Sequence, residues 1–189
     1  MNLRITPRAA SLTIAADPTL DRPCQVNWQG PEPTVREDDD GIEIGYGVAG
    51  RLRAMAPRGG SLAVALNPAL DWAIELRGGV SDLRADLREL RVSAIAITGG
   101  ASDIVFDLPR PGRDLPVRID GGVSEAMIDR PAGVPVRVEI DGGATGLRID
   151  DDVLGAVGGL VRQRAAGDDD GEIVVHVGGG ASGFTVGAR

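Results

Sequence analysis

A motif that begins with two glycines and continues with a small hydroxyl residue occurs five times in this chain. It reads GGVSDL at 78–83, GGASDI at 99–104, GGVSEA at 121–126, GGATGL at 142–147 and GGASGF at 179–184. The distance from the first glycine of one copy to that of the next is 21 residues from Gly78 to Gly99, 22 to Gly121, 21 to Gly142 and 37 to Gly179. A period near 20 residues predicts a stack of repeated units, because one such unit cannot bury its own core.

Short runs of alternating apolar and polar residues flank each glycine pair. Examples are WAIEL (72–76) and SAIAI (93–97) before the glycines, and LRADL (83–87) and IVFDL (104–108) after them. Alternation with period two predicts strands with one buried face. Prolines at 109, 111, 116, 131 and 135 disfavour helices between the strands. Aligning the repeats gives apolar columns, one of which contains Leu83, Ile104, Ala126, Leu147 and Phe184.

The pattern predicts an all-β fold, a single-stranded parallel β-solenoid (β-helix) with about 21 residues per coil. We expect the glycine pairs to form the coil corners, where they supply a positive φ and leave room for the next corner. The hydroxyls that follow should align as a ladder of Ser81, Ser102, Ser124, Thr145 and Ser182.

Two segments interrupt the regular repeats. Residues 1–58 are expected to form an N-terminal β segment that covers one solenoid end, and residues 59–189 the repeats, with an insertion at about 151–171. The open end of a solenoid exposes backbone and apolar core. We therefore expect the last coil to be covered either by the insertion or by a second molecule.

The repeats also resemble a known family. The stretch GGVSDLRADLRELRVSAIAITGGASDIVFDLP, followed by VRIDGGVSEAMIDRPAGVPVRVEIDGGATGL, is similar to the toast-rack β-solenoid domains, which include the C-terminal domain of bacterial Lia-type cell-envelope stress regulators. The resemblance extends over about residues 59–189. It implies a single-stranded β-helix that works by protein contact in envelope-stress signalling, often attached to a membrane segment, and it implies no catalytic residues.

Composition narrows the classes of partner. The net charge of −8 disfavours nucleic acid, because an acidic surface repels phosphate backbones. Cys24 is the only cysteine, which excludes an internal disulfide and a cysteine-based zinc site. No apolar run is long enough to span a membrane, and the first residues do not resemble a signal peptide. The sequence predicts a cytoplasmic protein, associated with a membrane only through a partner.

Several residues could in principle carry chemistry. Aspartates at strand ends form one column, Asp86, Asp107, Asp129 and Asp150, and these could cap turns, pair with arginine or share a cation. They are weak candidates for a metal site. His176, the only histidine, should face outward beside Glu139 in the next coil. The acidic runs at 37–40, 150–152 and 168–170 fit solvated loops better than calcium ligands.

Two further features have ordinary structural interpretations. GYGVAG at 45–50 matches G-x-G-x-x-G, but only six residues follow before Pro57, so we predict a turn and no cofactor. Trp72 begins a strand and is predicted to lie in the core and not to stack on a sugar.

The sequence therefore favours a non-enzymatic interaction or assembly module, regulatory in bacterial envelope stress. The alternatives are a carbohydrate- or cation-binding β-helix and a filament-forming scaffold. We expect contacts with a protein partner, or self-association through the solenoid ends. The candidate contact residues come from the insertion and are Leu154, Val157, Leu160, Arg162 and Arg164.

Overall fold

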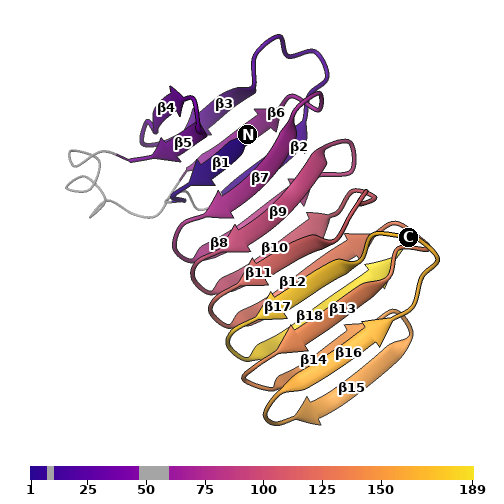
Figure 1. Cartoon of the computed structure of the whole chain (residues 1–189). Helices are drawn as coiled ribbons and strands as arrows, with labels where there is room; N and C mark the ends of the chain where they lie inside the picture. The colour runs from indigo at the N-terminus through magenta and orange to yellow at the C-terminus, as the bar shows by residue number, and fades with distance from the viewer. Residues whose placement is uncertain (8–10, 47–59) are drawn as a thin grey trace.

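The computed structural model describes residues 1–7, 11–46 and 60–189, which form strands and turns with no helix among them (Figure 1). The all-β prediction is confirmed. Two nine-stranded sheets lie face to face, and we call them sheet A and sheet B. In order across sheet A, the strands are β16 (Val161–Ala165), β13 (Val136–Ile140), β17 (Ile173–Val177), β11 (Leu115–Ile119), β9 (Arg91–Ile97), β7 (Asp71–Leu76), β1 (Asn2–Ile5), β5 (Gly41–Gly45) and β4 (Thr34–Asp38).

Sheet B has a matching order. Its strands are β15 (Asp152–Val157), β14 (Ala144–Ile149), β18 (Ala181–Ala188), β12 (Val123–Arg130), β10 (Ala101–Asp107), β8 (Val80–Asp86), β2 (Ser11–Ala16), β6 (Ser61–Leu66) and β3 (Cys24–Gln29). From β5 to β14 the chain passes alternately from one sheet to the other, so that β7 leads to β8 and β9 leads to β10. We call such a successive pair, one strand from each sheet, a rung.

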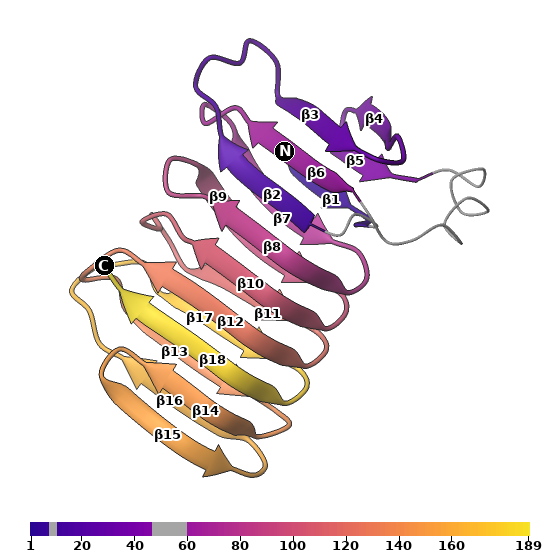
Figure 2. The same ribbon diagram turned by 180° about the vertical axis from the view of Figure 1, so that it is seen from behind.

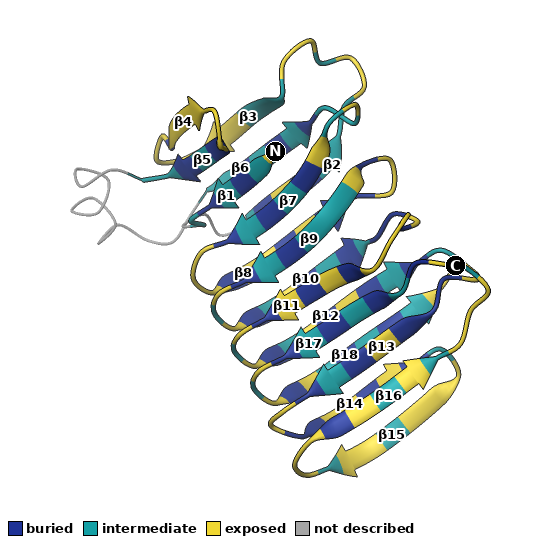
Figure 3. Cartoon of the chain, in the orientation of Figure 1, coloured by how far each residue is buried: buried dark blue, intermediate teal, exposed yellow. Residues whose placement is uncertain are grey.

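The register between rungs agrees with the predicted columns. Ile104 lies between Leu83 and Ala126, and Ala126 also pairs with Phe184. These side chains point between the sheets and are buried, whereas their sequence neighbours point outward (Figure 3). The core is therefore a continuous layer of aliphatic side chains, to which Phe106, Phe184 and Trp72 add the aromatic groups. Trp72 is fully buried, as predicted, and its indole nitrogen donates to the Asn67 carbonyl at 2.9 Å.

The order of the rungs in the stack differs from their order in the chain. The rung β17/β18 lies between β11/β12 and β13/β14, so the last rung of the sequence is an interior rung (Figures 1 and 2). At the other side, β1/β2 lies between β7/β8 and β5/β6. The expectation that the last coil stands at an end of the stack is therefore wrong.

Two hairpin-like segments form the actual ends of the stack. Strands β3 and β4 run antiparallel to β6 and β5, and β15 and β16 run antiparallel to β14 and β13. The other strands in each sheet are parallel to their neighbours. Among the described strands of the segment 1–58, β3 and β4 lie at the end, whereas β1, β2 and β5 belong to the stack itself. The insertion contributes β15 and β16, which form the opposite end.

The glycine pairs are the corners of the stack, as predicted. A Cβ added to Gly121 would stand 2.6 Å from the backbone nitrogen of Gly100, and one added to Gly99 would stand 2.6 Å from that of Gly79. Backbone therefore packs directly on backbone at these corners, which only glycine permits.

The left-handed residues lie elsewhere than predicted. Apart from Gly78 and Gly143, the glycine pairs do not have positive φ. Instead the fifth motif position does, with φ of 51° at Asp82 and Asp103 and 49° at Glu125, and glycine at Gly146 and Gly183. The side-chain hydroxyls do align, since Ser102 pairs with Ser81 and Ser124, but no hydrogen bond joins two of them within the described residues.

Candidate interaction surfaces at the ends of the stack

The outer face of sheet A carries a row of alternating charges. Reading across the sheet, the row contains Arg36, Glu43, Arg4, Glu75, Ala96, Arg118, His176, Glu139 and Arg162. Arg4 lies 3.6 Å from Glu75 and Arg162 lies 3.6 Å from Glu139. Because neighbouring charges are opposite in sign, this face largely neutralises itself, and each exposed pair contributes little to stability.

His176 is part of this row and lies beside Glu139, as predicted. Its Nε2 is 3.3 Å from the carboxylate of Asp141, while Nδ1 has no hydrogen-bond partner within the described residues. Arg118 occupies the position on its other side. A single imidazole between a guanidinium and two carboxylates fits an ion-pair row and lacks a nearby nucleophile.

The aspartate column on sheet B is only partly continuous. Asp107 lies between Asp86 and Asp129, but the next position is Gly187 of the inserted rung. Asp150 is therefore separated from the other three. The column that the sequence shows with four aspartates contains three neighbours in the fold.

Each aspartate of this column contacts an arginine. Arg88 donates to Asp86 from Nε at 2.8 Å, and this hydrogen bond lowers the pKa of Asp86. The side chain of Arg189 contacts both Asp107 and Asp129, and Arg130 contacts Asp150. Of the three predicted roles, the structure shows arginine pairing at all four aspartates. It also shows turn capping at Asp86, whose Oδ1 accepts from the Arg88 amide at 3.3 Å. In the part of the chain that it describes, no group of three or more potential ligands is placed to hold a metal ion.

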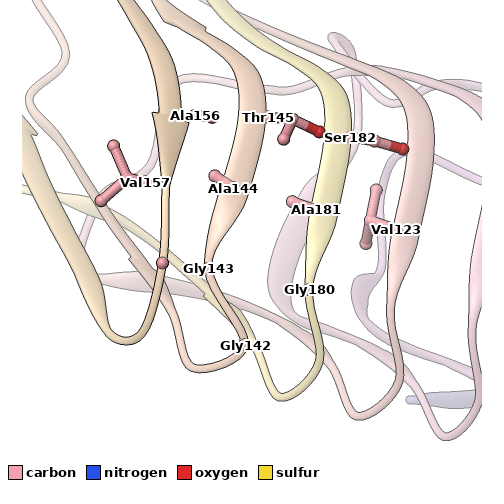
Figure 4. A pocket seen from close by; sticks show the side chains of 11 residues that line it. Val123, Gly142, Gly143, Ala144, Thr145, Ala156, Val157, Gly180, Ala181 and Ser182 are labelled. Carbon is pink, nitrogen blue, oxygen red and sulfur yellow. The ribbon is translucent and has the colours of Figure 1, made fainter.

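A shallow pocket lies at the glycine corner next to β15. Its volume is about 440 Å³, and Figure 4 shows Ala144, Ala181 and Val123 at equivalent places on three neighbouring strands. The rest of the lining is Gly142, Gly143, Thr145, Ala156, Val157, Gly158, Gly180 and Ser182. No side chain in this lining is ionisable, so the pocket has no group that could act as a general acid or base.

The β3/β4 end exposes side chains that face the core. Trp28 pairs with the buried Leu62, and Val35 pairs with the buried Ile44, so both point toward the space between the sheets. No rung covers them on the outer side, and Trp28 is 42% exposed and Val35 45% exposed. Neither residue was predicted from the sequence to lie at a contact surface. The signal available was the alternation in CQVNWQ, which places Cys24, Val26 and Trp28 on one face.

Cys24 belongs to the same end. It lies on the core-facing side of β3, opposite the buried Leu66, and is partly exposed. Burial raises the pKa of its thiol, and the negative charge of Glu37 raises it further, while Arg22 opposes the shift. At neutral pH the thiol is therefore protonated and weakly nucleophilic.

The opposite end contains the five predicted contact residues, but they do not form one cluster. Leu154 and Val157 face the core from β15 and pack against it. Leu160 lies in the turn that connects β15 to β16, and it is 50% exposed. Arg162 and Arg164 lie on the outer face of β16 and contact Glu139 and Glu172. Val153, which is 63% exposed on the outer face of β15, was missed because it follows an acidic run.

The G-x-G-x-x-G stretch at 45–50 falls, beyond Tyr46, outside the described residues. Among the residues that the structure does describe, no helix is long and apolar enough to cross a membrane.

Comparison with known proteins supports the resemblance seen in the repeats. Residues 50–129 match the family described as the N-terminal domain of toast_rack (DUF2154). This confirmed match lies earlier in the chain than the expected 59–189. A solved structure, described as a putative cell adhesion protein from Clostridium sporogenes, is similar to the whole chain with a TM-score of 0.66 and 17% sequence identity, and the match covers 92% of that protein. A search of curated proteins gave no match.

Proposed function

We propose that the chain, whose residues 50–129 match the toast-rack family, is a non-enzymatic protein-interaction module that makes its contacts through the ends of the stack. The observation that carries the proposal is the exposure of Trp28 and Val35, whose side chains face the core but have no covering rung. Exposed aromatic and aliphatic side chains in one patch are typical of protein contact sites.

The rest of the molecule supports a scaffold role. The outer face of sheet A carries a self-neutralising row of charges, and the pocket lining lacks ionisable groups. We also propose that the stack is a single-stranded β-solenoid with about 21 residues per coil. The even spacing of Gly78, Gly99, Gly121 and Gly142 supports this, together with their stacked corners.

The cellular setting is part of the proposal. The resemblance to Lia-type regulators favours a regulatory contact in bacterial envelope stress, made by a cytoplasmic chain that reaches the membrane through its partner. The similar solved structure is described as a putative cell adhesion protein, and adhesion is likewise a contact function.

Site-specific photo-crosslinking tests the proposal. A photoreactive amino acid replaces Trp28 at one end, Val153 at the other, or Met127 in the middle of sheet B, and the cells that express each variant are irradiated. Met127 is 44% exposed and therefore matches Trp28 in accessibility. We expect discrete crosslinked protein products from the end positions and none from position 127. Equal crosslinking from all three positions would contradict contact through the ends.

A further inference from the structure

We propose that strand β3 binds an extended segment of another protein, which adds to sheet B as a further strand and places a basic residue beside Glu37. This inference rests on the proposed interaction function and names the kind of partner that the β3/β4 end fits. It follows from the backbone edge of β3, the apolar side chains along that edge and the carboxylates of β4.

The outer edge of β3 offers free backbone hydrogen-bonding groups. The Asn67 amide donates to the Pro23 carbonyl at 2.9 Å, directly before the first residue of β3. Because bonded and non-bonded positions alternate in an antiparallel pair, the N–H and C=O groups of Cys24, Val26 and Trp28 point away from β6. No described strand lies on that side of β3 (Figure 3). These groups are therefore available to an added strand.

Strand β3 also lacks the usual protection of a free edge. It reads CQVNWQ and has neither a charge nor a proline. Edge strands that must stay unpaired usually carry charges, prolines or bulges. Strand β4, at the corresponding edge of sheet A, reads TVRED and has three charged residues. Sheet B is therefore the side of this end on which a strand would add.

The core-facing side chains at this end leave apolar surface uncovered. Cys24 and Val26 pack against the core and are partly buried, whereas Trp28 is 42% exposed. Val35 faces the space between the sheets from β4 and is 45% exposed. An added strand with apolar residues beside Val26 and Trp28 would remove much of this surface from water.

Glu37 determines the chemistry of the remaining inward position. Its side chain lies on the core-facing side of β4, opposite the buried Ile42. Its negative charge contributes to the raised pKa of the Cys24 thiol, so the carboxylate lies near the start of β3. Within the described residues it forms no ion pair. An uncharged strand would cover this carboxylate without a partner, which is costly, whereas lysine or arginine beside Cys24 would pair with it.

The charge around this end also favours a basic partner. Residues 21–40 contain six carboxylates and two arginines. Arg22 donates to Gln25 at 3.0 Å, and Arg36 lies on the outer face of β4, opposite Glu43. An acidic end attracts a basic segment and repels an acidic one. The partner is therefore a strand whose inward side chains are apolar at one end and basic at the other.

Binding of labelled peptides, measured by fluorescence anisotropy, tests this inference. The probe TVTVTKT places its valines and its lysine on one face of a strand, and TKTVTVT presents the same face in the opposite chain direction. Each probe has a counterpart with glutamate in place of lysine. We expect one lysine probe to bind saturably and its glutamate counterpart to bind at least about tenfold more weakly. Added salt should weaken the lysine probe, because the charge contribution is screened.

Three variants of the chain locate the binding site. Val26→Pro removes an N–H that points away from β6 and leaves the pairing with β6 intact, so it should weaken binding about tenfold or more. Glu37→Gln should remove most of the preference for lysine over glutamate. Asn27→Ala is the control and should bind like the wild type, because its side chain lies on the outer face and its backbone bonds to β6. Circular dichroism and thermal unfolding establish that each variant is folded.

Three results would overturn the inference. They are the absence of saturable binding by both lysine probes up to millimolar concentration, equal binding of the glutamate counterparts, and unchanged binding by folded Val26→Pro. The crosslinking experiment could still identify a protein that contacts the ends in another way, so failure here leaves the proposed function standing.

Discussion

Arg130 and Asp150 form an ion pair across the inserted strand β18, with 2.5 Å between Nη2 and Oδ2. Arg130 ends β12 on one side of β18, and Asp150 follows β14 on the other side. The same carboxylate accepts a hydrogen bond from the Ala188 amide at 3.0 Å. Arg130 is the buried charged residue of the described chain, and its Nη1 also donates to the Val134 carbonyl. The pair therefore holds the inserted rung between its two neighbours.

Replacement of Arg130 by methionine should lower the free energy of unfolding by about 1 to 3 kcal/mol, because Asp150 and the Val134 carbonyl lose a buried donor. The loss stays below that of a fully buried pair, since a third of the Asp150 side chain is exposed. Chemical denaturation measures the effect. Arg118→Met is the control, because Arg118 pairs with Asp120 on the exposed face and its loss should cost less than about 1 kcal/mol. Equal losses of stability in the two variants would contradict the conclusion that the Arg130–Asp150 ion pair holds the inserted rung in place.

Hydrogen exchange should show that β17 and β18 are among the most protected strands. Both have hydrogen-bonded neighbours on each side, whereas β15 and β16 have one neighbour each. We expect the amides of β15 and β16 to exchange first and those of β17 and β18 to exchange with global unfolding. Rapid exchange of β18 would be incompatible with its interior position.

Gly121→Ala should destabilise the chain by about 1 to 3 kcal/mol, because its Cβ would stand 2.6 Å from the backbone of the adjacent corner. The matched variant is Gly112→Ala, whose Cβ would meet nothing within 4 Å. We expect that control to change the stability by no more than about 0.5 kcal/mol. Thermal and chemical denaturation compare the two variants directly, and similar losses would argue against stacked corners.

The Cys24 thiol should react with iodoacetamide more slowly than a thiol in the unfolded chain, with a midpoint at higher pH. Burial and then Glu37 raise its pKa, so the thiolate is scarce at neutral pH. Since the raised pKa belongs to the folded state, the associated stabilisation is complete below the ordinary thiol pKa and decreases as the pH rises above it. Glu37→Gln should lower the pKa and speed alkylation. Glu32→Gln is the control and should not, because the charges that shift the thiol pKa are those of Glu37 and Arg22. Unchanged rates in Glu37→Gln would remove the electrostatic part of this explanation.

The strands and their facing were predictable from the sequence, but the order of the rungs was not. Period-two alternation decides which side of a strand is buried, and the glycine pairs decide where the corner falls. A column such as Ile104, Ala126 and Phe184 would be buried in the same way whatever the order of the rungs in the stack, so the column does not reveal that order. The 37-residue interval before Gly179 was the available sign that the last rung is not a simple continuation.

The fifth motif position illustrates a missed local signal. It contains Asp82, Asp103, Glu125, Gly146 and Gly183, a column of acidic residues and glycines. Glycine adopts left-handed backbone readily, and aspartate more often than most other residues, and the structure shows positive φ at all five positions. The prediction of positive φ fell on the glycine pairs instead, which are glycine for a different reason, the close contact between corners. Trp28 was missed because exposure of a core-facing residue depends on which strand is outermost.

The interior place of β17/β18 constrains how this chain can be made and lengthened. Residues 173–188 leave the ribosome after the strands on either side of them, so the gap between β12 and β14 is filled only late in synthesis. Until then, the edges of β11, β12, β13 and β14 that pair with β17 and β18 lack their hydrogen-bonding partners. Gene duplication could therefore add a rung among β7 to β12, where chain order and stack order agree, while an added repeat after β18 would find both adjacent positions already occupied.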